Sequence, residues 1–120
     1  MDKKNNIETL VSTMMGVSSI KEIEDQKRES AEHSINAKIS YENYREKALE
    51  NIRISRMYEM LYEKYQRIAH LSSMLLELIE ATSLLTNDSN TYYMLLSFYI
   101  REINEEKNFI EKYKMRNINI

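Results

Sequence analysis

The sequence predicts an all-α protein, because helix-forming residues run through it and almost nothing in it turns a chain. Its 120 residues include no proline and one glycine, while 30 % are charged and 42 % are hydrophobic. Glu, Lys, Leu, Ile, Met and Arg are abundant, and these residues tolerate helices well. A sheet protein of this length would need several turns, which usually recruit Gly or Pro. We therefore expect one helical domain over residues 1–120.

A short first helix is expected over about residues 6–15. Asn5 is a suitable N-cap residue, and Gly16 stands where a left-handed residue commonly ends a helix. Between them, four apolar residues recur with the spacing of one helix face: Ile7, Leu10, Val11 and Met14. Beyond Gly16, the box Ser19-Ile20-Lys21-Glu22 matches the S-x-x-E pattern and predicts that a second helix starts there.

The segment from about residue 20 to residue 85 contains neither glycine nor proline, so a long helix is expected. We assign residues 1–34 to the first helix and a nearly all-polar connector, with Ser34 as the expected place of a break. From residue 35 onward apolar residues recur at intervals of three and four. One helix over about residues 35–85 would be about 75 Å long, which is typical of a rod or coiled coil.

A third helix is expected over about residues 90–116. Residues 86–90, which precede it, are Thr, Asn, Asp, Ser and Asn, whose side chains compete with helical backbone hydrogen bonds. A short loop joins antiparallel neighbours, so residues 35–116 are predicted to form a long antiparallel helical hairpin.

The folded hairpin would align two apolar stripes. On the third helix the stripe alternates steps of four and three residues, a heptad pattern with one polar member, Glu106. Folding at residues 86–90 would place Leu85 opposite Tyr92 and Glu106 beside His70 or Leu71. The predicted hairpin core consists of Leu61, Tyr65, Ile68, Leu75, Leu78, Leu85, Tyr92, Leu96, Tyr99, Ile103, Ile110 and Tyr113.

The stripe over residues 35–57 would have no partner within the chain, because the third helix is too short to reach it. Large uncovered apolar surface usually marks an interaction site. We therefore expect a helical protein partner or a homo-oligomer, with an interface at Ile39, Tyr44, Ala48, Ile52 and Met57. The alternative is a compact three- or four-helix bundle with a break near residue 34, which would cover the stripes without a partner.

Several chemistries lack the residues that they need. Without cysteine there is no thiol nucleophile, disulfide or thiolate zinc site. Neither His33 nor His70 belongs to a Glu-x-x-His motif, and one glycine cannot build a phosphate-binding loop. We therefore expect no enzyme activity, catalytic residue, metal or cofactor. The net charge of −2 argues against nucleic-acid binding, and the lack of an apolar run of about 18 residues argues against membrane insertion.

A helical hairpin of this length, without cysteine or a signal-peptide core, resembles the small helical proteins of Gram-positive type VII secretion. The resemblance covers about residues 35–116. The chain has no tryptophan for the Trp-x-Gly turn of the WXG type, and no tyrosine is followed four residues later by an acid. Phe98 to Glu102 is the nearest such pattern. The helical partners of LXG toxins are the closer likeness, which implies an accessory protein that binds an exported protein and helps to target it.

The same resemblance implies a cytoplasmic protein, or one exported without a cleaved signal peptide. The alternative is a phage or viral protein, either a coiled-coil structural element or a small inhibitor of host machinery. Richness in Asn, Lys, Ile and Tyr suits an AT-rich coding source, which bacteria of this group share with phages and large DNA viruses.

Overall fold

The computed structural model describes residues 3–46, 52–82 and 89–117, and it confirms the all-α class. Four helices occupy these ranges, which contain no strand: α1 (Lys3–Met15), α2 (Ile20–Glu46), α3 (Ile52–Glu80) and α5 (Ser89–Asn117). The molecule is a rod with principal extents of 59 × 22 × 22 Å.

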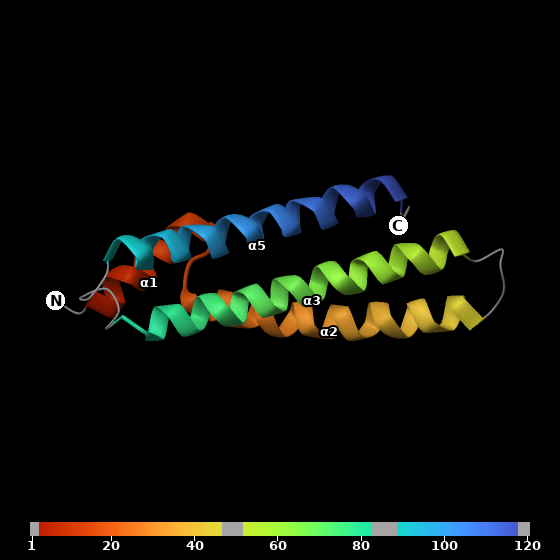
Figure 1. The fold of residues 1–120 in the computed structure, drawn as a ribbon, viewed down its shortest axis with the longest axis horizontal. Helices are drawn as coiled ribbons and strands as arrows, with labels where there is room; N and C mark the ends of the chain where they lie inside the picture. The colour runs from red at the N-terminus through yellow and green to blue at the C-terminus, as the bar shows by residue number, and fades with distance from the viewer. Residues whose placement is uncertain (1–2, 47–51, 83–88, 118–120) are drawn as a thin grey trace.

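The central helix of the rod is α3 (Figure 1). Both α2 and α5 pack along α3 and run antiparallel to it, whereas α2 and α5 do not pack against each other. The short helix α1 lies at the end of the rod where α5 begins, and it contacts the other three helices. Both long seams of the rod are therefore formed on α3.

The single helix expected over residues 35–85 is wrong. α2 ends at Glu46, and α3 begins at Ile52 and runs back along α2 (Figure 1). The stretch that was expected to lack a partner inside the chain is thus folded on itself, and the Tyr44 and Tyr58 rings stack with centroids 5.7 Å apart. Folding back removes from water the apolar faces that a lone helix would expose, and this gain outweighs the preference of the local sequence for continued helix.

Small side chains hold α2 against α3. After Ile23, the buried residues of α2 are Ser30, Ser34 and Ala37, which lie on one helix face. The Ser34 Oγ donates a 3.2 Å hydrogen bond to the backbone carbonyl oxygen of Tyr62 on α3. Ser34 therefore lies inside a helix and marks no break. Residues 20–34, which were expected to form a nearly all-polar connector, belong to α2 and pack closely against α3.

The hairpin of α3 and α5 has a register one heptad away from the predicted one. The Tyr92 hydroxyl donates a 2.8 Å hydrogen bond to the carbonyl oxygen of Leu78, seven residues before the expected neighbour Leu85. Leu85 itself lies outside the described residues. Because α3 ends at Glu80, its seam stops earlier than the heptad pattern suggests. A slip of seven residues keeps the same side chains in a seam, so the apolar pattern fits both registers equally well.

Charged side chains join the two helices along this seam. Lys64 Nζ lies 3.0 Å from both carboxylate oxygens of Glu106, and Arg67 lies 3.0 Å from Glu102. Glu106, expected beside His70 or Leu71, thus pairs about two turns earlier on α3, as the shifted register requires. His70 is exposed.

The residues assigned to the hairpin core occupy the interior of the rod for the most part. Tyr92 is one of the buried residues, and its burial raises the pKa of its phenol. Tyr65, Tyr99 and Tyr113 are half-buried and pack against the core with their rings. The fully buried members of the predicted set are Leu61, Ile68, Leu75, Leu78, Tyr92, Leu96, Ile103 and Ile110.

α1 covers one end of the core through a stripe that differs from the expected one. Ile7, Val11 and Met15 are buried, whereas Leu10 and Met14 are exposed. The helix begins at Lys3, so Asn5 lies within it and is not its cap. The apolar side chains of α1 that face the core are therefore spaced by four residues, rather than by the expected mixture of three and four.

Gly16 ends α1 as the sequence indicates. Its φ is +70°, in the left-handed region. The Gly16 N–H donates to the Thr13 carbonyl at 3.2 Å, and the Val17 N–H donates to the Ser12 carbonyl at 3.0 Å. These two bonds form the Schellman motif that satisfies the last carbonyl groups of a helix.

The start of α2 is stabilised by the glutamate of the predicted box, Glu22, but its partner is the serine one residue before the predicted one. Glu22 accepts hydrogen bonds from the Ser18 hydroxyl at 2.6 Å and from the Ser18 N–H at 3.0 Å. These two donors, the hydroxyl first, hold the pKa of Glu22 below its usual value. Glu22 therefore reaches Ser18 instead of closing the box on Ser19.

We expect Gly16→Ala to lower the free energy of unfolding by about 1 kcal/mol, because an L-residue is strained in the left-handed conformation. A Cβ at this position would meet no atom within 4 Å, so the loss comes from the backbone alone. Urea denaturation followed by circular dichroism measures it. Gly16→Asn is the matched variant and should lose less, since Asn tolerates this conformation. Equal stability of all three proteins would contradict this account of how α1 ends.

Candidate interaction surface

The outer face of α5 carries apolar side chains that no other described helix covers. Leu96, Ile100 and Ile103 are buried on the face of α5 that packs against the rest of the rod. α2 does not pack on α5, so the opposite face is open to solvent. Within residues 93–98 of α5, four side chains are large, apolar or aromatic, and exposed: Tyr93, Met94, Leu95 and Phe98.

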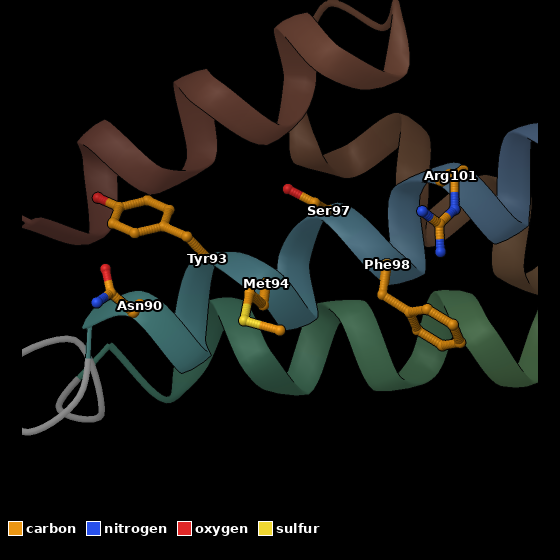
Figure 2. Close-up of a pocket in the computed structure, with 6 residues that line it drawn as sticks. All are labelled: Asn90, Tyr93, Met94, Ser97, Phe98 and Arg101. Carbon is orange, nitrogen blue, oxygen red and sulfur yellow. The ribbon is translucent and has the colours of Figure 1, made fainter.

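Residues from successive turns of α5 line an open groove on this face, which we name the α5 groove (Figure 2). Met94 is the most exposed of their large apolar side chains, with an exposed fraction of 71 %. Methionine adapts its shape to a partner, and Tyr, Phe, Met and Arg are enriched at protein interfaces. The residues of the groove are Asn90, Tyr93, Met94, Ser97, Phe98 and Arg101.

Among the described residues that line the α5 groove, Arg101 is the only charged one. Its guanidinium carbon lies 5.7 Å from the centroid of the Phe98 ring. Among the residues that the structure describes, it forms no ion pair, whereas the neighbouring Glu102 is paired with Arg67. The groove is thus apolar along most of its length and ends in a cation that is available to a carboxylate.

The folding of α2 onto α3 partly covers the residues expected to form a partner interface, although Tyr44 and Ile52 line one open pocket between the two helices. Tyr44 is half-buried in its stack with Tyr58, and Met57 is buried with an exposed fraction of 8 %. Ile39 and Ile52 are exposed, and Ala48 lies outside the described residues. The surface that this set was expected to form is therefore partly covered within the chain.

The α5 groove was missed by this reasoning from sequence, although a signal for it exists. Met94 and Phe98 each lie two residues from Leu96, and two residues correspond to about 200° around a helix. They therefore lie nearly opposite a buried position. Apolar residues on both sides of one helix indicate either a fully buried helix or a second contact surface.

Titratable residues form no evident reactive cluster in the described part of the chain. No three His, Cys, Asp or Glu side chains within residues 3–46, 52–82 and 89–117 could hold a metal ion. The His33 ring lies against the Tyr65 ring, with centroids 5.0 Å apart.

None of the described helices is long and apolar enough to cross a membrane.

No known protein family, curated protein or solved structure matches this chain. Its function must therefore be inferred from its own surface. The α5 groove has the chemistry of a binding site, because it combines exposed aromatic and methionine side chains with Arg101, which forms no ion pair with another described residue.

Proposed function

We propose that this chain is a non-enzymatic helical interaction protein that binds an amphipathic helix of another protein along the α5 groove. The observation that carries the proposal is the exposure of Tyr93, Met94 and Phe98, which line the α5 groove together on one face of the helix. Single exposed apolar residues are ordinary, but a contiguous group on one helix face is typical of a contact site. A groove lined at intervals of three and four residues suits the helix-in-groove mode of recognition.

Arg101 suggests how the partner helix is oriented. It stands at one end of the apolar stretch, over the Phe98 ring, and lacks an ion pair within the described residues. A partner helix with apolar residues on one face and a carboxylate near one end would cover the groove and neutralise this charge. Complementary charges of this kind contribute more to orientation and partner choice than to affinity.

Among partners, we propose the helical domain of an exported protein of the type VII or LXG class. What supports this choice is the likeness of architecture: an all-helical rod with an uncovered helix face resembles the accessory proteins that bind such domains. In this proposal the rod supplies a stiff surface to which the partner helix binds. The partner and the complex that it forms with the rod then determine export.

The test is co-expression of the chain with the products of its neighbouring genes, followed by purification and light scattering. We expect a stable heteromer with one of them, and at least tenfold weaker binding for Met94→Glu, since a carboxylate would be placed in an apolar contact. Met115→Glu is the matched control, because Met115 is also a largely exposed methionine of α5 and lies outside the groove. Binding that is unchanged by Met94→Glu, or weakened equally by both substitutions, would refute the role of the groove.

A further inference from the structure

The pocket that Tyr44 and Ile52 line lies between the end of α2 and the start of α3, at the end of the rod opposite α1 (Figure 1). We name it the tip pocket. It is open to solvent and has a volume of about 220 Å³. Pockets for drug-sized ligands measure about 300–1,000 Å³, so the tip pocket has room for one small molecule.

Two arginine side chains line the tip pocket, Arg45 from α2 and Arg56 from α3. Neither forms an ion pair with another described residue, although Glu59 lines the same pocket. Both guanidinium groups are therefore available to an anion. Each has five N–H donors in a planar fork, which matches the oxygen atoms of a phosphate or a carboxylate.

A buried hydroxyl lines the pocket as well. Ser55 has an exposed fraction of 6 %, and its hydroxyl has no hydrogen-bond partner among the described residues. Buried polar groups are nearly always hydrogen-bonded, because leaving one unsatisfied destabilises the fold. An oxygen atom bound in the pocket would give Ser55 a partner, so this hydroxyl indicates a ligand independently of the two arginines.

The start of α3 adds positive partial charge to the same place. Acidic side chains or bound anions usually stabilise the N-terminus of a helix, where the macrodipole is positive. The first turn of α3 contains no acidic residue, and Arg53 stands in it. Cations and the positive end of the dipole thus repel one another at the start of α3, and a bound anion would relieve this repulsion.

The acidic residues at this end of the rod stand mostly outside the pocket. Glu42 and Glu46, near the end of α2, are exposed and do not line it. Glu59 lines it and is half-buried, so the charged residues of the lining are two cations and one anion. Glu59 reduces the attraction for an anion, and it also offers an acceptor to a hydroxyl group of the ligand.

We propose that the tip pocket binds the phosphate group of a small phosphate ester. The donors converge on the pocket from both helices: the guanidinium of Arg45 from α2, and the guanidinium of Arg56 with the hydroxyl of Ser55 from α3. A tetrahedral phosphate has oxygen atoms in several directions and can accept from all of them. A carboxylate has two oxygen atoms in one plane and would satisfy fewer.

Two tyrosines provide a surface for the carbon part of the ester. Tyr41 and Tyr44 both line the pocket. The Arg45 guanidinium carbon lies 6.0 Å from the centroid of the Tyr41 ring, and the Tyr44 ring is stacked on Tyr58. These contacts restrict the rings beside the arginines, so an organic group attached to the phosphate would pack against an aromatic wall.

Titration of the isotopically labelled chain with inorganic phosphate and with phenyl phosphate, followed by heteronuclear NMR at constant ionic strength, tests the proposal. We expect saturable shifts of the Ser55 and Arg56 amide signals, with a dissociation constant of about 1 mM for phenyl phosphate. Inorganic phosphate should bind about threefold more weakly, because it lacks the ring. Acetate should bind about fivefold more weakly than inorganic phosphate, because it accepts fewer hydrogen bonds.

Substitutions distinguish the pocket from general attraction of anions. Arg45→Gln and Arg56→Gln should each weaken phenyl phosphate binding about tenfold. Arg53→Gln is the matched control, because it removes the same charge from the start of α3 outside the pocket, and it should change the affinity less than about twofold. Glu59→Gln should strengthen binding about threefold by removing a repulsive charge. The three arginines are exposed, and circular dichroism will verify that each variant is folded.

The absence of a saturable shift up to about 50 mM of either phosphate probe would overturn the proposal. Acetate that binds as tightly as phosphate, or Arg53→Gln that weakens binding as much as Arg45→Gln, would also overturn it. If phenyl phosphate bound no more tightly than inorganic phosphate, the assignment to an ester would be wrong. Met94→Glu in the α5 groove should leave phosphate binding unchanged, so the two sites are tested separately.

Discussion

Leu75→Asp is expected to lower the free energy of unfolding by about 4 kcal/mol or more, the largest effect of any single substitution that we predict. Leu75 is completely buried at the centre of α3, the helix that forms both long seams. Removing its side chain costs the transfer free energy and leaves a cavity, and a carboxylate there would be unpaired. Since proteins of this size have a total stability of about 5–15 kcal/mol, the variant should be largely unfolded in mild urea.

Leu10→Asp is the matched control for Leu75→Asp, because it makes the same chemical change at an exposed position of α1. We expect it to change the free energy of unfolding by less than about 1 kcal/mol. Urea titrations of both variants, followed by helical circular dichroism, give the comparison. If both substitutions had similar effects, the assignment of α3 as the central helix would be incorrect.

Ser34→Leu is expected to lower the free energy of unfolding by about 3 kcal/mol. Ser34 is buried between α2 and α3, and its hydroxyl contacts the backbone of Tyr62. A leucine there would push the two helices apart, and overpacking of this kind costs about 1–3 kcal/mol. The lost hydrogen bond adds about 1 kcal/mol. Thermal and urea denaturation would both report the change.

Two further variants separate the causes of the Ser34→Leu effect. Ser34→Ala removes the hydrogen bond without adding volume, and we expect a loss of about 1 kcal/mol. Ser97→Leu makes the same increase in volume on the exposed side of α5 and should be almost neutral. A nearly neutral Ser34→Leu would show that α2 and α3 are not in close contact at this position.

Much of the fold could be predicted from local signals. The helix expected over residues 90–116 is observed as Ser89–Asn117, and Gly16 ends α1 in the conformation that its lack of a Cβ favours. These elements depend on periodicity and on one backbone conformation. Both are properties of a few adjacent residues, so a single sequence is sufficient to identify them.

The pairing of α2 with α3 could not be predicted in the same way. No glycine or proline stands between Glu46 and Ile52, so the sequence contains no strong signal for ending a helix there. The contact also uses Ser30, Ser34 and Ala37, which a search for large apolar residues passes over. Small residues stabilise a helix pair by allowing close approach, which is visible only when both helices are in place.

The surroundings of the predicted interface could not be foreseen for a related reason. Residues 39–57 seemed uncovered because they were thought to extend beyond the third helix. Once α2 folds back, Met57 and Tyr44 find neighbours within the chain, and the uncovered face moves to Met94 and Phe98 on α5. Whether a helix face is exposed depends on which other helices pack against it. The exposed surface therefore depends on the tertiary arrangement more strongly than the helices themselves do.

The charged pairs between α3 and α5 also determine how strongly the native alignment of these two helices is favoured over a slipped one. A seven-residue slip of α5 along α3 would preserve most apolar layers of the seam, so apolar packing alone discriminates weakly between the two alignments. The slip would separate Lys64 from Glu106 and Arg67 from Glu102, leaving a largely buried carboxylate beside apolar side chains. Ion pairs of this kind add little to the stability of the native alignment. Their loss raises the free energy of the slipped alignment. The polar residues of the seam thus create an energy gap that its apolar residues cannot provide.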